Sequence, residues 1–133
     1  MDDIMVARVM SSDVHTVTPE TLVEDAATAM LDNGIGSVVV VDGNNELEGI
    51  LTTTDFVTIV SKSHPKAETC VERYMTTDVV TANAQDSIRD VADVMVEEGF
   101  HHMPVVDETE GVIGMITTSD LAAYISTVQT PTP

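Results

Sequence analysis

The stretch Gly49-Ile-Leu-Thr-Thr-Thr-Asp55 recurs as Gly114-Met-Ile-Thr-Thr-Ser-Asp120, and this duplicated segment decides the fold class. In each copy an apolar run ends in hydroxyl residues, and an aspartate follows the first of them by three positions. A hydroxyl residue before a helix can accept hydrogen bonds from the free N–H groups, and an aspartate in the first turn complements the helix dipole. Each copy therefore predicts a strand that leads directly into a helix.

The duplication extends over the whole chain, because an offset of 65 residues aligns the sequence with itself without a gap. The matched residues include Val6, Arg8 and Met10 with Val71, Arg73 and Met75, Gly34 with Gly99, and Val40-Val-Asp42 with Val105-Val-Asp107. A repeated sequence predicts a repeated structure. We expect one repeat at residues 1–65, a second at 66–128, and a flexible tail at 129–133.

Each repeat predicts a short leading helix and then the order β-α-β-β-α, which is an α/β fold. Apolar residues at helical spacing indicate the first long helix, and a glycine follows it as expected of a left-handed C-cap. The expected leading helices are 2–10 and 67–75, the extended pieces 14–17 and 79–81, the first long helices 22–33 and 88–98, the strands 37–41, 47–51, 103–106 and 112–116, and the last helices 54–61 and 119–128. A repeat of this length is only marginally stable on its own. We therefore expect the two repeats to pack through their sheets into one pseudo-symmetric module with two equivalent clefts.

The charge balance is strongly acidic. The 133 residues include 23 Asp and Glu against 5 Lys and Arg, for a net charge of −18. This composition carries no basic stripe, so we expect no nucleic-acid partner. The acids are spread along the chain, which favours a halophilic, salt-adapted surface over an acidic tail or a cation-binding cluster.

Other functional classes are disfavoured by what the sequence lacks. No apolar run is long enough to span a membrane, and the acidic start does not resemble a signal peptide, so we expect a cytoplasmic protein without a membrane partner. The single cysteine, Cys70, excludes an intrachain disulfide and indicates a packing position rather than a reactive thiol. We expect no metal site, since the adjacent His101 and His102 would point to opposite faces of a strand. Phosphate-binding glycine loops are absent, and nothing fixes a catalytic triad, so an enzyme is not expected.

The start of the last helix in each repeat has two interpretations. Threonine and aspartate there could serve only as helix caps. A helix N-terminus can also offer N–H groups to a phosphate, with the Thr52 and Thr54 hydroxyls as added donors. The Asp55 carboxylate could accept hydrogen bonds from the two hydroxyls of a ribose, which suits a nucleoside with a phosphate.

The duplicated "G-h-h-T-x-x-D" segments, the glycines that end the helices and Met103-Pro-Val-Val-Asp107 together resemble a tandem pair of CBS (cystathionine-β-synthase) domains, a Bateman module. The resemblance covers about residues 4–127. It implies an α/β module that binds adenosine-containing ligands (AMP, ADP, ATP or S-adenosylmethionine) in its clefts as a regulatory sensor, with no obligatory cofactor and with an unknown effector protein as partner. It also implies a homodimer through the apolar last helices, although these residues could instead pack within the module.

The resemblance further implies which residues line each cleft. The first cleft would comprise Thr52, Thr54 and Asp55 with Met75, Val80, Phe100, His101 and His102. The second would comprise Thr117, Ser119 and Asp120 with Met10, His15, Ile35 and Ser37. The histidines make the first cleft better suited to a phosphate, and the second to a weakly charged adenosine compound. The alternative is a structural dimerisation or docking module with empty clefts.

Overall fold

The computed structural model describes residues 4–62 and 68–128. The chain forms two compact units, and neither of them coincides with a single sequence repeat. Unit 1 combines Met1–Asp13 with Val80–Pro133, and unit 2 is the continuous segment Val14–Val79. The expected flexible tail at 129–133 and the expected boundary between the repeats at residues 65 and 66 lie outside the described residues.

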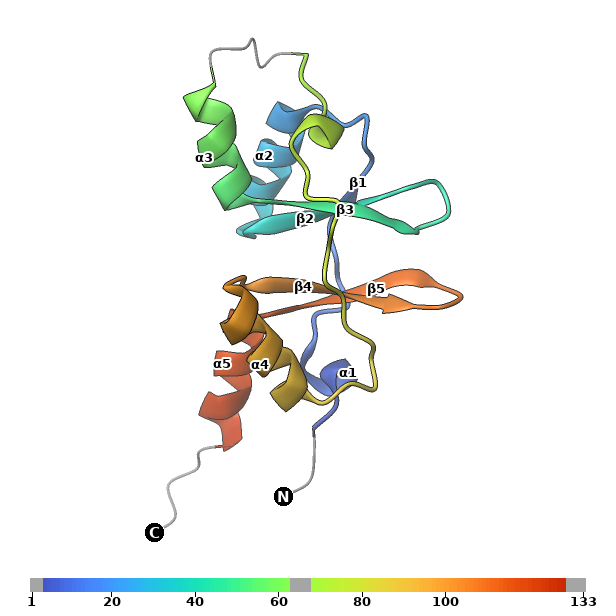
Figure 1. The fold of residues 1–133 in the computed structure, drawn as a ribbon, viewed down its shortest axis with the longest axis vertical. Coiled ribbons are helices and arrows are strands. Elements are labelled where there is room, and N and C mark those ends of the chain that lie inside the picture. The colour runs from blue at the N-terminus through green and yellow to red at the C-terminus, as the bar shows by residue number, and fades with distance from the viewer. Residues whose placement is uncertain (1–3, 63–67, 129–133) are drawn as a thin grey trace. The chain divides into compact units, whose positions relative to one another are not determined.

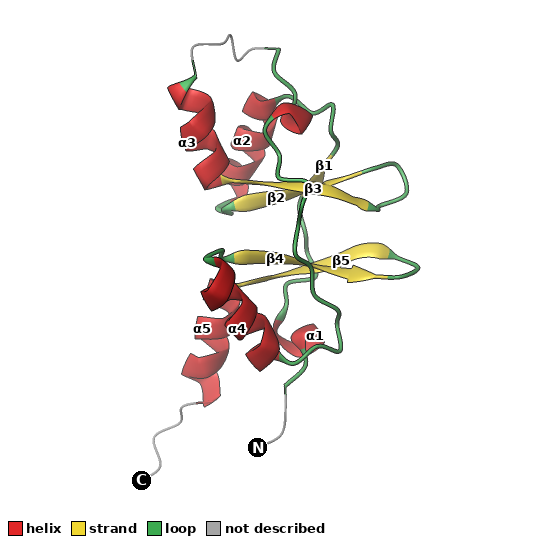
Figure 2. Ribbon diagram, viewed as in Figure 1, coloured by secondary structure: helices red, strands yellow, loops and turns green. Residues whose placement is uncertain are grey.

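Unit 2 has helices on one face of a three-stranded sheet (Figure 2). Its elements are β1 (Thr16–Val17), α2 (Val23–Asn33), β2 (Ser37–Val41), β3 (Leu47–Thr52), α3 (Thr53–Ser61) and the 3-10 helix η1 (Val71–Arg73). The strand order is β1-β2-β3, with β1 parallel to β2 and β2 antiparallel to β3. This arrangement leads β3 straight into α3, as the Gly49–Asp55 stretch predicts.

Unit 1 repeats this plan with a smaller sheet. Its elements are α1 (Val6–Val9), α4 (Ile88–Glu98), β4 (His102–Asp107), β5 (Gly111–Thr117) and α5 (Thr118–Val128). The strands β4 and β5 form an antiparallel pair, and a single parallel bridge from Ala82 to Val105 stands where unit 2 has β1. The extended piece expected at 79–81 is therefore reduced to one bridge, displaced to Ala82.

The other expected elements are confirmed to within a residue or two, apart from the leading helices. These are shorter than expected, at four residues in α1 and three in η1. The long helices end as predicted at Gly34 and Gly99, which adopt φ values of 62° and 76°. None of the helices in the described ranges is long and apolar enough to cross a membrane.

The leading segment of each repeat packs into the unit formed by the other repeat. The fully buried Val6 belongs to the core of unit 1, together with Val91 and Ile116. Its counterpart Val71, also fully buried, belongs to the core of unit 2 with Leu51. In Figure 1, the blue α1 accordingly lies beside the orange to red α4 and α5. The repeat in sequence is therefore not the unit that packs in space.

Backbone hydrogen bonds join the segment after each leading helix to the last strand of the unit in which it packs. Ser11 and Met115 exchange two N–H···O bonds of 2.9 Å in unit 1. At the equivalent place in unit 2, Ile50 and Thr76 exchange bonds of 3.0 and 2.9 Å. The exchanged segments run so close to the strands that only glycine fits beside them: a Cβ on Gly49 would lie 2.7 Å from the Thr76 carbonyl oxygen. The glycine that opens each duplicated stretch is thus explained by packing.

Candidate functional site

The end of β3 and the start of α3 form one candidate site, in unit 2. Thr52 is the N-cap of α3, and Asp55 occupies the third helical position. The Thr52 backbone N–H donates to Asp55 Oδ2 at 2.8 Å, and the Thr52 hydroxyl donates to the same oxygen at 3.3 Å. Both residues are half-buried. This is a capping box, so the interpretation of Asp55 as a helix cap is confirmed.

Unit 1 has the same arrangement between β5 and α5. The Thr117 backbone N–H donates to Asp120 Oδ2 at 2.9 Å, and the Asp120 N–H donates to the Thr117 hydroxyl at 3.1 Å. Thr117 and Asp120 are half-buried like their counterparts. The two capping boxes are therefore close structural copies.

Capping leaves part of each carboxylate available. Within residues 4–62 and 68–128, the side-chain hydrogen bonds of Asp55 and Asp120 are all accepted by Oδ2. A carboxylate oxygen has two lone pairs and can accept further hydrogen bonds through Oδ1. Each site thus presents an acceptor held in place by the cap, while the exposed hydroxyl residues Thr54 and Ser119 lie one position before it. This combination can bind a ligand hydroxyl while its own helix stays capped.

The start of a neighbouring strand completes each site. Ser37 pairs with Thr52 across β2 and β3, and His102 pairs with Thr117 across β4 and β5. Because strand side chains alternate, these residues lie on the sheet face opposite the helix-packed side chains. The loops before the strands contact the helix starts as well, since the Thr53 N–H donates to the Gly36 oxygen at 3.1 Å.

Unit 1 makes the equivalent loop contact: the Thr118 N–H donates to the His101 oxygen at 3.0 Å. Burial of the His102 ring and the nearby His101 lower the pKa of His102, and Asp120 raises it by a smaller amount. The surroundings of His102 therefore lower its pKa and favour the neutral form of the ring. Ser37, its counterpart in unit 2, is only 7% exposed and carries no charge.

The grouping predicted from sequence combines residues of both repeats, with His101 and His102 beside Asp55 and Ser37 beside Asp120, and it stays a prediction. Within each unit the structure brings His102 to Asp120 and Ser37 to the Thr52 cap of Asp55. The cause is the hairpin register, because the first residue of one strand faces the last residue of the next strand in the same repeat.

The remaining predicted site residues distribute over both units. Met75 contacts the Gly49 region in unit 2, as Met10 contacts the Gly114 region in unit 1, so each methionine shares a unit with the aspartate assigned to it. The other four are placed as follows: His15 accepts from the Val39 N–H through its backbone oxygen, Ile35 packs on the core of unit 2, Phe100 packs on the core of unit 1, and Val80 is 41% exposed. The complete ligand-contact sets stay predictions.

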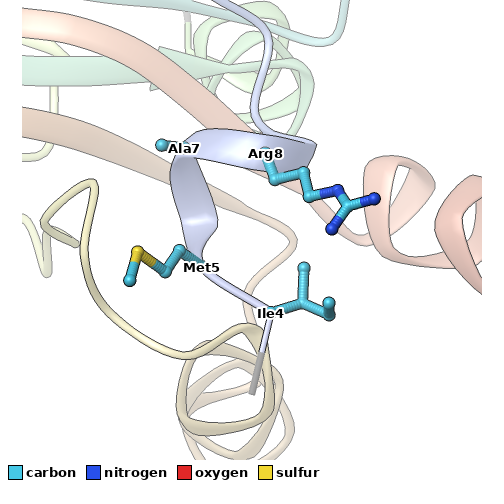
Figure 3. A pocket seen from close by; sticks show the side chains of 4 residues that line it. All are labelled: Ile4, Met5, Ala7 and Arg8. Atoms are coloured by element: carbon cyan, nitrogen blue, oxygen red, sulfur yellow. The ribbon is translucent and has the colours of Figure 1, made fainter. Parts of the chain in front are cut away.

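Two pockets involve residues that the sequence analysis did not select. An apolar pocket of about 380 Å³ lies between the end of α2 and the start of α3, and Ile35 is its one predicted residue. Its other lining residues are Ala27, Met30, Leu31, Gly34, Thr53 and Phe56. The second, of about 420 Å³, surrounds the α1 turn and is lined by Ile4, Met5, Ala7 and Arg8 (Figure 3). No local sequence signal indicates the first pocket, because its lining comes from the end of α2 and the start of α3.

Among the described residues, no three His, Cys, Asp or Glu side chains lie together in a way that could hold a metal ion. The candidate sites are therefore defined by the two capping boxes and the strand starts beside them.

The model of the CBS domain family matches residues 6–62 and 71–127. The chain belongs to the CBS domain family. Among relatives of this CBS-domain protein, a 17.7 kDa protein of Acidianus ambivalens is 31% identical over 94% of the chain and 75% of its own length. Homoserine O-acetyltransferase of Methanosalsum zhilinae is 33% identical over 94% of the chain, which spans only 25% of that enzyme.

Solved CBS structures share the fold. A CBS-domain protein from Burkholderia ambifaria is 30% identical, with a TM-score of 0.87 over 97% of this chain and 98% of that one. The CBS pair of protein MJ0100, solved with 5′-methylthioadenosine and S-adenosyl-L-methionine, has a TM-score of 0.87 at 24% identity, covering 95% of this chain and 98% of its own. CBSX2, solved with AMP, has a TM-score of 0.85 at 22% identity, covering 95% and 99%. The tandem CBS pair and its α/β fold are thereby confirmed.

Proposed function

We propose that this CBS pair is a regulatory module that binds adenosine-containing ligands at the capping boxes of α3 and α5. The ligand class is AMP, ADP, ATP or S-adenosylmethionine, and its binding would alter contacts with an effector protein. The ligand is a regulator, and the module needs no obligatory cofactor.

One observation carries the proposal: Asp55 and Asp120 are each fixed by a cap through Oδ2, and Oδ1 accepts no side-chain hydrogen bond in the part of the chain that the structure describes. A ribose offers two adjacent hydroxyl donors to such an oxygen. The helix N-terminus beside it favours negative charge, so the same place accommodates a phosphate or carboxylate. The adenosine compounds bound by the MJ0100 pair and by CBSX2 support this choice of ligand class.

The proposal is tested by thermal unfolding in the presence of adenosine, AMP, ATP, S-adenosylmethionine and GTP, each at millimolar concentration. The measurement is made in low salt and in about 2 M KCl, where the screening length is near 3 Å or less and the net charge of −18 repels anions least. A ligand at 100 times its Kd adds about 2.7 kcal/mol to the free energy of unfolding. We expect adenosine compounds to raise Tm by several degrees and GTP to leave it unchanged.

Matched variants separate ligand binding from capping. Asp55→Ala and Asp120→Ala remove the proposed ribose acceptors. Asp42→Ala removes a carboxylate that caps a hairpin turn instead, through the Asn44 and Glu46 N–H groups at 2.8 and 3.0 Å. The ligand-dependent shift in Tm should disappear in the double variant of Asp55 and Asp120 and persist in Asp42→Ala. An unchanged shift in the double variant would contradict the ribose role.

The second candidate function is a structural module that dimerises or docks with empty sites. The observation in its favour is a set of exposed apolar side chains on the helices of both units, at Leu31 (82%), Val57 (71%), Val60 (72%), Val96 (82%) and Ile125 (54%). We propose that these faces support a homodimer, with or without ligand. Light scattering in high salt should give about twice the chain mass of 14.2 kDa. A monomeric mass would reject the dimer, and no shift with any adenosine compound would favour the structural module.

A further inference from the structure

We propose that unit 1 has a further binding site, at the α1 turn, for small organic anions that combine a carboxylate or phosphate with an apolar body. Arg8 binds the anionic group, and Ile4, Met5 and Ala7 contact the apolar part. The site shares no residue with the capping boxes, so this inference does not depend on the proposed function.

The pocket at the α1 turn has the size and the lining of a small-molecule site. Its volume of about 420 Å³ lies within the range of ligand pockets, which are mostly apolar with a few placed polar groups. Among the described residues, its lining comprises the apolar Ile4, Met5 and Ala7 together with Arg8. The Met5 side chain is 53% exposed, and its flexible thioether can adapt to an apolar ligand. This lining indicates a ligand that is apolar apart from a charged group.

Arg8 is the one free cation among the Lys and Arg side chains that the structure describes. Arg73 lies over the Tyr74 ring, 5.9 Å from its centroid, and Lys62 and Arg89 each have a partner group. The sequence contains 23 Asp and Glu residues, yet none of those described pairs with Arg8. A guanidinium that meets no carboxylate in its own chain is open to one from outside, which it can bind through two parallel N–H···O bonds.

The second repeat shows why Arg8 is free. The 65-residue offset aligns Arg8 with Arg73 and Val9 with Tyr74. A cation is attracted to an aromatic face within about 6 Å of the ring centre, so Tyr74 engages Arg73. Val9 has no ring, so Arg8 lacks this partner. Arg73 is therefore the matched control for Arg8, because the same side chain at the same place in the repeat is already engaged.

The charged and apolar parts of the pocket lie next to each other. Figure 3 shows the Ile4 and Arg8 side chains on the same side of the α1 turn. An anion held by the guanidinium thus places its apolar body against Ile4. The segment that carries both residues is fixed in unit 1, since Val6 is fully buried and its N–H donates to the Asp86 oxygen at 2.8 Å. The site is therefore held in place before a ligand binds.

The test compares probes that separate charge from apolar contact. Phenylacetate and phenyl phosphate carry an anionic group on an aromatic body, phenylacetamide carries a neutral amide on the same body, and acetate carries the charge alone. Ligand-observed saturation-transfer NMR with the full chain gives the Kd of each probe. The medium is about 1 M KCl, where the screening length is about 3 Å, so the net charge of −18 does not repel anions from a distance.

Phenylacetate and phenyl phosphate should bind about tenfold more tightly than phenylacetamide and acetate, as expected for a charge-assisted hydrogen-bonded pair. Arg8→Gln should raise the Kd of phenylacetate about tenfold and leave that of phenylacetamide unchanged, whereas Arg73→Gln should change neither. The Met5 methyl signal, assigned with Met5→Leu, should shift when phenylacetate binds, because Met5 lines the pocket.

Equal binding of phenylacetate and phenylacetamide would overturn the inference, as would equal losses in Arg8→Gln and Arg73→Gln or an unmoved Met5 signal. Absence of binding by both aromatic anions to the folded wild-type chain would overturn it as well. A preference between these two anions supports the site and identifies the anionic group that it takes. None of these outcomes involves Asp55 or Asp120, so the proposed function is judged separately.

Discussion

Unit 1 and unit 2 are made from the same repeat, yet they differ in three ways that bear on function. Unit 2 is one continuous segment with a three-stranded sheet, whereas unit 1 joins two distant segments around a two-stranded sheet. At the strand start beside the cap, unit 1 has His102 and unit 2 has Ser37. The capping boxes themselves are almost unchanged. The comparison indicates that duplication preserved the acceptor geometry while the strand starts diverged, with an ionisable ring in unit 1 and a hydroxyl in unit 2.

The largest expected effect concerns two valines in the leading segments of the repeats. Val6 and Val71 are both fully buried, each in the unit of the other repeat. We expect Val71→Ala and Val6→Ala to cost about 2–3 kcal/mol each through the cavity they leave. Hydrogen exchange should rise in unit 2 for Val71→Ala and in unit 1 for Val6→Ala. Faster exchange within the same sequence repeat instead would contradict the observed units.

The glycines that open the duplicated stretches give the next largest effect. A Cβ at Gly49 would meet a backbone oxygen at 2.7 Å, while one at Gly114 would meet the flexible Met10 sulfur at 2.6 Å and the Ser11 oxygen at 2.9 Å. We expect Gly49→Ala to lower the free energy of unfolding by about 2–3 kcal/mol and Gly114→Ala by about 1–2 kcal/mol. Denaturant unfolding measures both. Gly43→Ala, whose Cβ meets nothing within 4 Å, is the control and should change little.

A smaller effect compares the caps. Asp55→Ala and Asp120→Ala each remove the side-chain acceptor for a capping threonine N–H, which is worth about 1 kcal/mol. Because the two bonds are nearly equal in length, the two losses should agree within a few tenths of a kcal/mol. Thermal unfolding without ligand checks this, and a large difference between the variants would show that the caps are not equivalent.

The smallest effect is a pH dependence confined to unit 1. The pKa of His102 is lowered in the folded chain from 6.5, so between the folded and unfolded values the unfolded chain binds the proton and the folded chain does not. The free energy of unfolding therefore falls as the pH drops below 6.5. His102→Gln should make this slope shallower in urea titrations from pH 7 to 5. An unchanged slope would mean that the ring is not held neutral by its surroundings.

Much of this fold could be predicted from local sequence. The helical spacing of Val23, Ala26 and Met30 predicted α2. Gly34 and Gly99 predicted the ends of the long helices, because the residue after such a helix adopts a left-handed conformation. The Gly49–Asp55 stretch predicted both the β3–α3 junction and its capping box. These features depend on residues close together in the chain.

Features that depend on distant pairing were missed. Nothing local shows that Val6 packs with Val91, or that Thr76 pairs with Ile50, since a repeat aligned in sequence suggests a unit cut at its own boundary. The neighbours of the strand starts within each unit were missed as well, since only the hairpin register shows that His102 faces Thr117. The apolar pocket by Phe56 was also beyond reach, because it forms where two helix ends meet.

The ribose role of the two capping carboxylates is best tested by a calorimetric titration of 5′-methylthioadenosine into the wild-type chain, Asp55→Ala, Asp120→Ala and the double variant, in high salt. We expect binding to the wild type, retention of a single site in one or both single variants, and no binding to the double variant while it remains folded. Undiminished binding to the folded double variant would contradict the central claim that these two capping carboxylates hold the ribose.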